Sequence, residues 1–245
     1  MKKNILLLVT GKTTQIITET VWALACDPNS NEKWIPNEIK VISTTDGIKE
    51  INKTLLGTNG VFKKLLDEYS LPPIHFDKNS LIAITNEKNG PLEDLKTPED
   101  NEFAANKICE VIRLLTQEDN SLHVSIAGGR KTMGFYAGYA LSLYGRPQDR
   151  MSHVLVSSDP AKEPETKIIK IAKKKMIDQD EISEIIELDS FFAKIWLANI
   201  PFVRMRDAII PKHQLNPEHG KDFTTIVNEI NKSFEPIELT LFIKN

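Results

Sequence analysis

Apolar runs alternate with helical stretches along residues 4–157, and this alternation limits the fold more than any other feature of the sequence. The first run, Asn4–Val9, has no interleaved polar positions, which is typical of a central strand in a parallel sheet that is covered on both faces. A chain in which strands and helices take turns builds a mostly parallel sheet with helices on both sides. We therefore predict an α/β fold over residues 1–158.

Periodicity and turn residues give the expected elements of this region. The predicted strands are Asn4–Val9, Glu38–Ser43, Ser80–Thr85, Leu122–Ile126 and His153–Ser157. The predicted helices are Gln15–Ala25, Ile48–Tyr69 with a break near Gly57 and Gly60, Glu102–Thr116 and Lys131–Tyr144. Ligands of such sheets bind outside the carboxyl ends of the strands, where the strand order reverses. Three loops qualify by position: Thr10–Gln15, Ser43–Asp46 and Ala127–Thr132.

The character of the chain changes after Ser158, and we predict a small mixed α/β C-terminal extension over residues 159–245 as a lid or dimer element. It begins with a charged, proline-containing linker. The expected elements are a short strand at Glu184–Leu188, a strand or hairpin at Ile195–Arg206, a helix at Phe223–Phe234 and a strand at Ile237–Ile243.

Composition excludes some functional classes. The formal net charge of −3 argues against a broad grip on long nucleic acid, which needs a basic surface. The apolar part of the N-terminal segment is shorter than the ~7–15 residues of a secretory signal, and no stretch approaches the ~20 apolar residues of a membrane span. We expect a cytoplasmic protein in which Cys26 and Cys109 are buried thiols within helices. No Cys or His spacing predicts a metal site, and we expect no cofactor.

The turn VTGKTTQ, Val9–Gln15, contains Gly-Lys-Thr but is not a P-loop. That motif needs a glycine five positions before Gly11, and this position is Leu6, inside the predicted strand. The remaining signal is a hydroxyl-rich turn between a strand and a helix. It is explained equally well by a ligand-binding role or by simple N-capping with threonine.

The segment SIAGGRKTM, Ser125–Met133, is a stronger signal. Two glycines precede Arg130 and Lys131, which begin a helix. Cations at a helix start oppose the helix dipole unless an anion offsets them. Glycines let a ligand approach the backbone, and free amides at the helix start bind phosphate. We therefore predict a phosphate site; the alternative is a glycine turn with solvated charges.

Together, SIAGGRKTM, TGKTTQ and the later IPFVRMRD resemble the CRISPR-associated Rossmann-fold (CARF) proteins, and most of all the stand-alone ring nucleases of type III CRISPR systems. The resemblance covers residues 1–160 well and Ala198–Asp207 more loosely. It implies a Rossmann-like fold and a homodimer that holds a cyclic oligoadenylate, usually the four-membered ring, across its two-fold axis. It further implies metal-independent cleavage by 2′-hydroxyl attack, giving linear products with a 2′,3′-cyclic phosphate.

The resemblance also implies roles for single residues. The family's catalytic lysine corresponds to Lys131. The hydroxyl of its G-x-S-x-Q turn, usually serine, corresponds to Thr13, which adds a methyl group. The expected ligand-binding residues are Thr10, Gly11, Gln15, Thr45, Ser125, Gly128, Gly129, Arg130 and Thr132.

Several weaker features keep alternatives open. The acidic loop Asn89–Glu102 would repel phosphate, and we expect it to be a solvated surface rather than a dimer contact. Arg204 and Arg206 are either a lid over the ligand or structural salt-bridge partners. The R-x4–6-H pattern of a second RNA-cutting domain occurs by chance twice, at Arg146/His153 and Arg206/His213, so we predict no RNase.

Three functions compete at this stage. The leading prediction is a ring nuclease that switches off cyclic oligoadenylate signalling. The first alternative is a sensor that holds the ring without cutting it and regulates a partner protein. The second is a transcription regulator, which would need a recognition helix and a basic surface.

Overall fold

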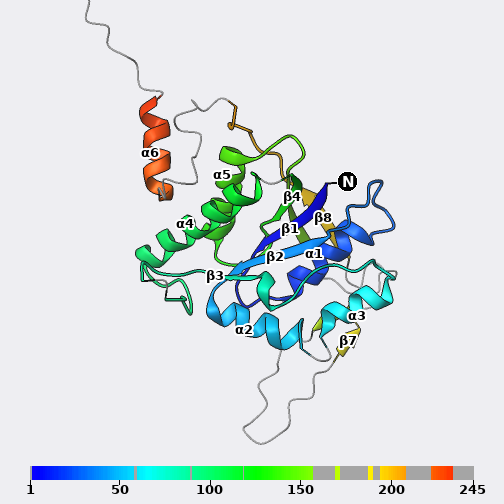
Figure 1. The fold of residues 1–245 in the computed structure, drawn as a ribbon. Coiled ribbons are helices and arrows are strands. Elements are labelled where there is room, and N and C mark those ends of the chain that lie inside the picture. Colours follow the sequence, from blue (N-terminus) through cyan, green and yellow to red (C-terminus); the bar gives the residue numbers. More distant parts are fainter. Residues whose placement is uncertain are drawn as a thin grey trace, which may run out of the picture.

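A six-stranded sheet forms the centre of the molecule (Figure 1). The computed structural model describes residues 2–57, 60–88, 90–117, 119–156, 169–171, 187–189, 194–207 and 222–233. The strands of the sheet are β1 (Lys3–Val9), β2 (Glu38–Ser43), β3 (Leu81–Ala83), β4 (Asn120–Ser125), β5 (Arg150–Val156) and β8 (Ile195–Asn199). Their order is β3-β2-β1-β4-β5-β8; β1 to β5 run parallel and β8 pairs antiparallel with β5. The predicted mostly parallel α/β sheet is confirmed.

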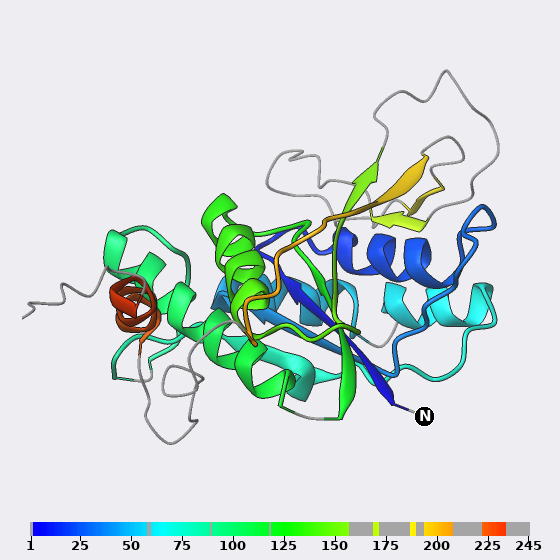
Figure 2. The same ribbon diagram turned by 90° about the horizontal axis from the view of Figure 1, so that it is seen from above.

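Helices cover both faces of this sheet (Figure 2). The described helices are α1 (Gln15–Ala25), α2 (Thr45–Thr54), α3 (Val61–Glu68), the 3-10 turn η1 (Lys78–Ser80), α4 (Pro98–Leu115), α5 (Lys131–Tyr144) and α6 (Phe223–Ser233). Of these, α6 packs against α4, on the side away from the sheet (Figures 1 and 2). Alternate side chains of β1 enter two different cores. Ile5, Leu7 and Val9 pack with α4 and α5, whereas Leu6 and Leu8 pack with α1 and α3. The continuous apolar run of β1 follows from this two-sided burial.

Most predicted elements are present, with different ends. The helix at α4 begins at Pro98 instead of Glu102 because Thr97 and Asp100 form a capping box: Thr97 Oγ1 accepts from the Asp100 amide at 3.1 Å and Asp100 Oδ2 accepts from the Thr97 amide at 3.0 Å. The third strand is shorter than predicted because Ser80 belongs to η1, where its hydroxyl accepts from the Asp77 amide. The predicted break near Gly57 and Gly60 separates α2 from α3.

The expected C-terminal extension contributes an edge strand to the main sheet. Strand β8 supplies five register pairs with β5, from Ser152↔Asn199 to Val156↔Ile195. A separate antiparallel pair joins β6 (Ile169–Ile171) to β7 (Glu187–Asp189), which overlaps the predicted strand at Glu184–Leu188. The predicted linker at 159–165 and the predicted strand at Ile237–Ile243 lie outside the described residues. The boundary at residue 158 stays a prediction.

Arg206 binds the carboxyl ends of two helices and Arg204 binds the turn between α5 and β5, so the lid interpretation is wrong. Arg206 Nη1 donates to the carbonyls of Thr116 and Tyr144, at 3.0 and 3.1 Å, where α4 and α5 end. Arg204 donates to the carbonyls of Arg146 and Asp149. The last carbonyls of a helix lack partners within the helix, and cations are favourable there. Both arginines are structural, and their contacts with the described residues are to backbone carbonyls.

The two cysteines are free. Cys109 is buried in α4, as predicted, and its Sγ lies 3.4 Å from the Tyr144 hydroxyl. Cys26 is only partly buried and follows the last residue of α1, so the prediction that it lies within the helix is wrong by one residue. Burial raises the pKa of both thiols to about 11, which keeps them protonated near neutral pH.

His123 is a buried histidine in the middle of the sheet. Its side chain lies on β4, where Nε2 is 2.7 Å from Ser152 Oγ and the ring contacts Trp34. Nδ1 has no hydrogen-bond partner among the described residues. Burial lowers the pKa of the imidazole from 6.5 to about 3. The folded protein therefore holds this group neutral, whereas the unfolded chain protonates it below pH 6.5.

Acidification is expected to destabilise the fold through His123. Between pH 6.5 and 3 the unfolded state binds a proton on His123 that the folded state does not bind, so the free energy of unfolding falls as pH falls. At pH 5 the loss is about 2 kcal/mol. Urea unfolding at pH 7.5 and pH 5 measures it. The variant His123→Gln should lose this pH dependence, and an equal dependence in the variant would contradict the assignment.

Candidate functional site

The candidate site lies where the strand order of the sheet reverses. Strand β1 has β2 on one side and β4 on the other, so the loops that follow these three strands share one edge of the sheet. These are the loops predicted from the sequence at residues 10–15, 43–46 and 127–132. In open α/β sheets this position is the usual place for a ligand.

Glycines let the three loops touch. A Cβ on Gly11 would lie 3.7 Å from Gly129 Cα, and one on Gly47 would lie 2.7 Å from the Gly11 carbonyl oxygen. A Cβ on Gly128 would collide with Ile16 Cδ1 and with Thr10 Oγ1. Gly129 has a φ of +76°, in the left-handed region that favours glycine. The Gly128–Gly129 turn is therefore required both by packing and by backbone conformation.

Three helices begin at this edge, and two of them, α1 and α5, have open first amides. The first amide of α2 donates to the Leu92 carbonyl. Within the described ranges, α1, α2 and α5 have no side-chain hydrogen bond to their first amides. By contrast, α4 carries a complete capping box. The first turn of α1 and of α5 also contains no acidic residue. Free amides and the positive end of the helix dipole favour an anion at this position.

The predicted site residues fall into three groups by exposure. Thr13, Gly129, Arg130, Lys131 and Thr132 are exposed, and Gly11, Gln15, Thr45 and Gly128 are partly buried. Thr10 and Ser125 are fully buried. The Thr10 hydroxyl donates to the Thr13 carbonyl at 3.1 Å, and Ser125 Oγ lies 3.4 Å from Thr20 Oγ1. These two hydroxyls shape the loops from inside.

Two of the cations at this edge already have carboxylate partners. Lys12 Nζ lies 2.9 Å from Asp46 Oδ2, and Arg130 Nη2 lies 2.8 Å from Asp94 Oδ2. The hydrogen bond from Lys12 lowers the pKa of Asp46. The hydrogen bond from the Leu95 amide lowers the pKa of Asp94 most, and the hydrogen bond from Arg130 lowers it further.

Asp94 belongs to the acidic loop that we expected to be only a solvated surface. Thr45 anchors this loop, because its amide and its hydroxyl both donate to the Leu92 carbonyl, at 2.8 and 3.0 Å. The loop is therefore a wall of the site, and Thr45 acts through it.

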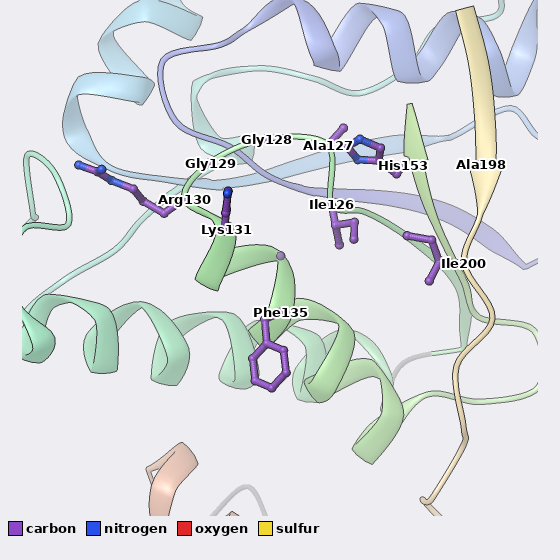
Figure 3. A pocket seen from close by; sticks show the side chains of 11 residues that line it. Ile126, Ala127, Gly128, Gly129, Arg130, Lys131, Phe135, His153, Ala198 and Ile200 are labelled. Atoms are coloured by element: carbon purple, nitrogen blue, oxygen red, sulfur yellow. The ribbon is translucent and has the colours of Figure 1, made fainter. Parts of the chain in front are cut away.

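Lys131 differs from these cations. Across the part of the chain that the structure describes, its ammonium group has no ion-pair or hydrogen-bond partner. Figure 3 shows Lys131 projecting from the first turn of α5 beside the Gly128–Gly129 turn, while Arg130 extends away from the apolar side chains of the pocket. Lys131 is thus an exposed cation, at a helix start where cations are unfavourable, beside open backbone amides.

A pocket of about 650 Å³ opens beside this turn. Its lining combines the glycine turn with residues of α5, β5 and β8: Ile126, Ala127, Gly128, Gly129, Arg130, Lys131, Gly134, Phe135, His153, Ala198 and Ile200. The sequence analysis missed two lining residues next to its predicted loop, Ile126 and Gly134, and four others, Phe135, His153, Ala198 and Ile200. Phe135 follows Lys131 by four residues and had a helical signal. The other three are brought to the pocket by the β5–β8 pairing, which no local pattern reveals.

Searches of the described residues for two other features were negative. No helix there is both long and apolar enough to cross a membrane. No cluster of three or more His, Cys, Asp or Glu side chains in these ranges has the arrangement of a metal site.

Comparison with protein families gives a match. The model of the family described as CRISPR-associated protein NE0113 (Cas_NE0113) matches residues 13–236. No curated protein matches the chain. The match includes the Gly128–Gly129 turn, Lys131 and β8, and it confirms the predicted CRISPR association. With nearly the whole chain covered, this protein belongs to the CRISPR-associated protein NE0113 family.

Proposed function

We propose that this protein is a ring nuclease that binds and cleaves cyclic oligoadenylate and so ends antiviral signalling by a type III CRISPR system. The observation that carries the proposal is the exposed Lys131, without a partner in the described chain, beside a glycine turn and an open helix start. Because the chain belongs to a CRISPR-associated family, we consider anionic ligands that act in CRISPR systems. Cyclic tetra-adenylate is the ring expected from the resemblance of the sequence to ring nucleases.

The phosphates of the ring would bind at the edge formed by the three loops. The amides at the start of α5 and the Lys131 ammonium group supply donors for one phosphate. A ring with two-fold symmetry suits a homodimer in which each protomer contributes the same edge. The proposal therefore includes a homodimer that acts in the cytoplasm.

Cleavage would rely on positioning and charge rather than on a metal ion. The 2′-oxygen of one ribose attacks the adjacent phosphorus, a 2′-O–P bond forms, and the bond from phosphorus to the 5′-oxygen breaks. The 2′-hydroxyl proton passes to solvent, and the 5′-oxygen takes a proton from solvent. Lys131 would stabilise the growing charge on the phosphoryl oxygens, and the exposed Thr13 hydroxyl would orient the ribose.

Purified protein incubated with excess cyclic tetra-adenylate and EDTA is expected to open many rings per protein molecule. Chromatography with mass spectrometry should identify linear adenylates that end in a 2′,3′-cyclic phosphate. Products with another terminus would contradict the proposed chemistry. Tight binding with recovery of the intact ring would overturn the nuclease assignment and favour a sensor.

The Arg130–Asp94 pair gives a separate prediction about affinity. Exposed ion pairs contribute only about 0–1 kcal/mol, so Arg130 can exchange this carboxylate for a ligand phosphate at small cost. Asp94→Asn removes the competing charge while keeping an oxygen for the Leu95 amide. Ring affinity, measured by calorimetry at low salt, is expected to rise about threefold.

A matched control is Asp119→Asn, which alters an exposed ion pair with Lys2 at the opposite edge of the sheet. This control should leave the affinity unchanged. If Asp94→Asn binds the ring no better than the unaltered protein, Arg130 does not contact a ligand phosphate.

A further inference from the structure

The pocket beside the glycine turn has two chemically different ends. Gly128, Gly129 and Lys131 form one end, which offers backbone amides and a cation. Ile126, Ala198 and Ile200 form the other end, which is apolar except for the imidazole of His153 (Figure 3). A ligand that fills both ends must carry an anionic group joined to an apolar body.

The apolar end is built from three neighbouring strands and is firmly held. The Ile126 amide donates to the Ser152 carbonyl at 3.0 Å, and the Ile200 amide donates to the Met151 carbonyl at 2.8 Å. His153 lies directly opposite Ala198 in the β5–β8 pairing. Met151 and Ser152 are consecutive residues of β5, and their carbonyls accept from the two isoleucine amides. The position of the gap between the Ile126 and Ile200 side chains is therefore fixed by the sheet.

His153 brings the only ring nitrogens to the apolar end as the structure describes it. Its side chain is partly buried, and within the described residues it has no hydrogen-bond or ion-pair partner. An imidazole offers one donor and one acceptor, which can pair with the edge of a flat heteroaromatic ring. Isoleucine side chains provide the apolar surface that the face of such a ring requires.

We infer that this apolar end is a nucleobase subsite. The phosphate of a nucleotide lies at Lys131 and the Gly128–Gly129 turn, its base lies between Ile126 and Ile200, and His153 reads the edge of the base. The pocket volume of about 650 Å³ is typical of small-molecule sites. The inference rests on the proposed function for its ligand class, and it assigns the base to residues that neither the sequence resemblance nor the family match assigns.

This subsite makes β8 part of the ligand site. Ala198 is a residue of β8, and Ile200 is the first residue after this strand. Both belong to the region that the sequence analysis treated as an extension. The role assigned to that region is to close the base subsite from the edge of the sheet.

Isoleucine methyl NMR tests the inference without requiring cleavage. The protein is titrated with adenosine 5′-monophosphate and, in a separate sample, with ribose 5-phosphate. The second compound carries the same phosphate and sugar without the base. The ring current of the base should shift the methyl signals of Ile126 and Ile200, assigned with Ile126→Val and Ile200→Val, and ribose 5-phosphate should leave them in place. Equal shifts with both compounds, or no shift with either, would overturn the subsite.

The affinities of three variants for these two compounds give a second test of the base subsite. Ile200→Ala and His153→Gln are each expected to weaken binding of adenosine 5′-monophosphate about fivefold and to leave ribose 5-phosphate binding unchanged. Val203→Ala, which changes an exposed apolar residue outside the pocket, is the matched control and should have no effect. Equal losses for both compounds would mean that the variants disturb the phosphate end, and would overturn the assignment.

The two proposals fail in different ways. If cyclic tetra-adenylate is cleaved while the methyl signals of Ile126 and Ile200 stay unmoved by the bound ring, the base subsite is wrong and the nuclease assignment stands. If adenosine 5′-monophosphate shifts these signals while the ring is recovered intact, the nuclease assignment is wrong and the subsite stands.

Discussion

Replacing Lys131 by alanine is expected to slow ring opening by about 100-fold or more. The ammonium group is exposed, has no partner in the described chain, and lies at the start of α5 where phosphoryl oxygens would bind. A donor aimed at charge that grows in the transition state mainly affects kcat. Single-turnover rates at saturating cyclic tetra-adenylate measure this effect separately from binding. Lys131→Arg keeps the charge and should recover part of the rate.

The control for this variant is Lys107→Ala, which removes a lysine from α4 that pairs with Glu110 at 2.7 Å. Its rate should match that of the unaltered protein. A Lys131→Ala protein that retains more than a third of the activity would contradict the catalytic role. A variant that loses affinity while keeping kcat would reassign Lys131 to ground-state binding.

Thermal stability provides an independent signature of the same residue. A cation in the first turn of a helix is unfavourable by about 0.3–1 kcal/mol at low salt, and α5 has no acidic residue there to offset it. The alanine variant should therefore be slightly more stable than the unaltered protein while it is far less active. Opposite changes in activity and stability are expected when a residue is placed for a ligand rather than for the fold.

Local patterns were sufficient to predict the scaffold of the site. The apolar run of β1, the Gly128–Gly129 turn and the start of α5 at Lys131 all have strong local signals, and the structure places them as expected. Parallel pairing brings the carboxyl ends of the strands to one edge, so the three loops could be grouped from the sequence alone.

The walls of the site could not be predicted in the same way. The Asp94–Arg130 pair joins residues 36 positions apart, and His153 reaches the pocket beside Ala198 through an antiparallel strand that arrives much later in the chain. The sequence also left the role of Arg204 and Arg206 open between a lid and structural contacts, because it does not show which backbone carbonyls lack a partner. Contacts of this kind depend on tertiary packing and carry no periodic signal.

Asp149 is the clearest example of a residue without a local signal. It lies in the turn between α5 and β5, is completely buried, and accepts from the backbone amides of Leu122 and Arg146 at 3.0 and 2.7 Å. The Arg146 guanidinium also donates to both carboxylate oxygens, at 2.9 Å each. The carboxylate therefore joins β4 to the end of α5.

Asp149→Ala is expected to reduce the free energy of unfolding by about 3–5 kcal/mol. The change leaves the mostly buried Arg146 without its carboxylate partner, and it removes the acceptor of two backbone amides. Urea unfolding at pH 7.5 measures the loss. The control Asp119→Asn, in an exposed pair, should unfold at the same urea concentration as the unaltered protein. A loss below about 1 kcal/mol, the typical contribution of an exposed pair, would show that Asp149 is dispensable.

A double substitution separates the ion pair from the backbone bonds. Arg146→Met combined with Asp149→Ala also removes the guanidinium that has lost the Asp149 carboxylate, so the double variant should be more stable than Asp149→Ala alone. The Leu122 amide still lacks its acceptor in the double variant, so recovery should be partial. Full recovery would assign the whole effect to the buried charge. Asp149 lies near the end of α5 that is opposite Lys131. Folded protein of any of these variants should therefore still bind the ring. Such a result would show that Asp149 supports the sheet and takes no part in ligand binding at its other edge.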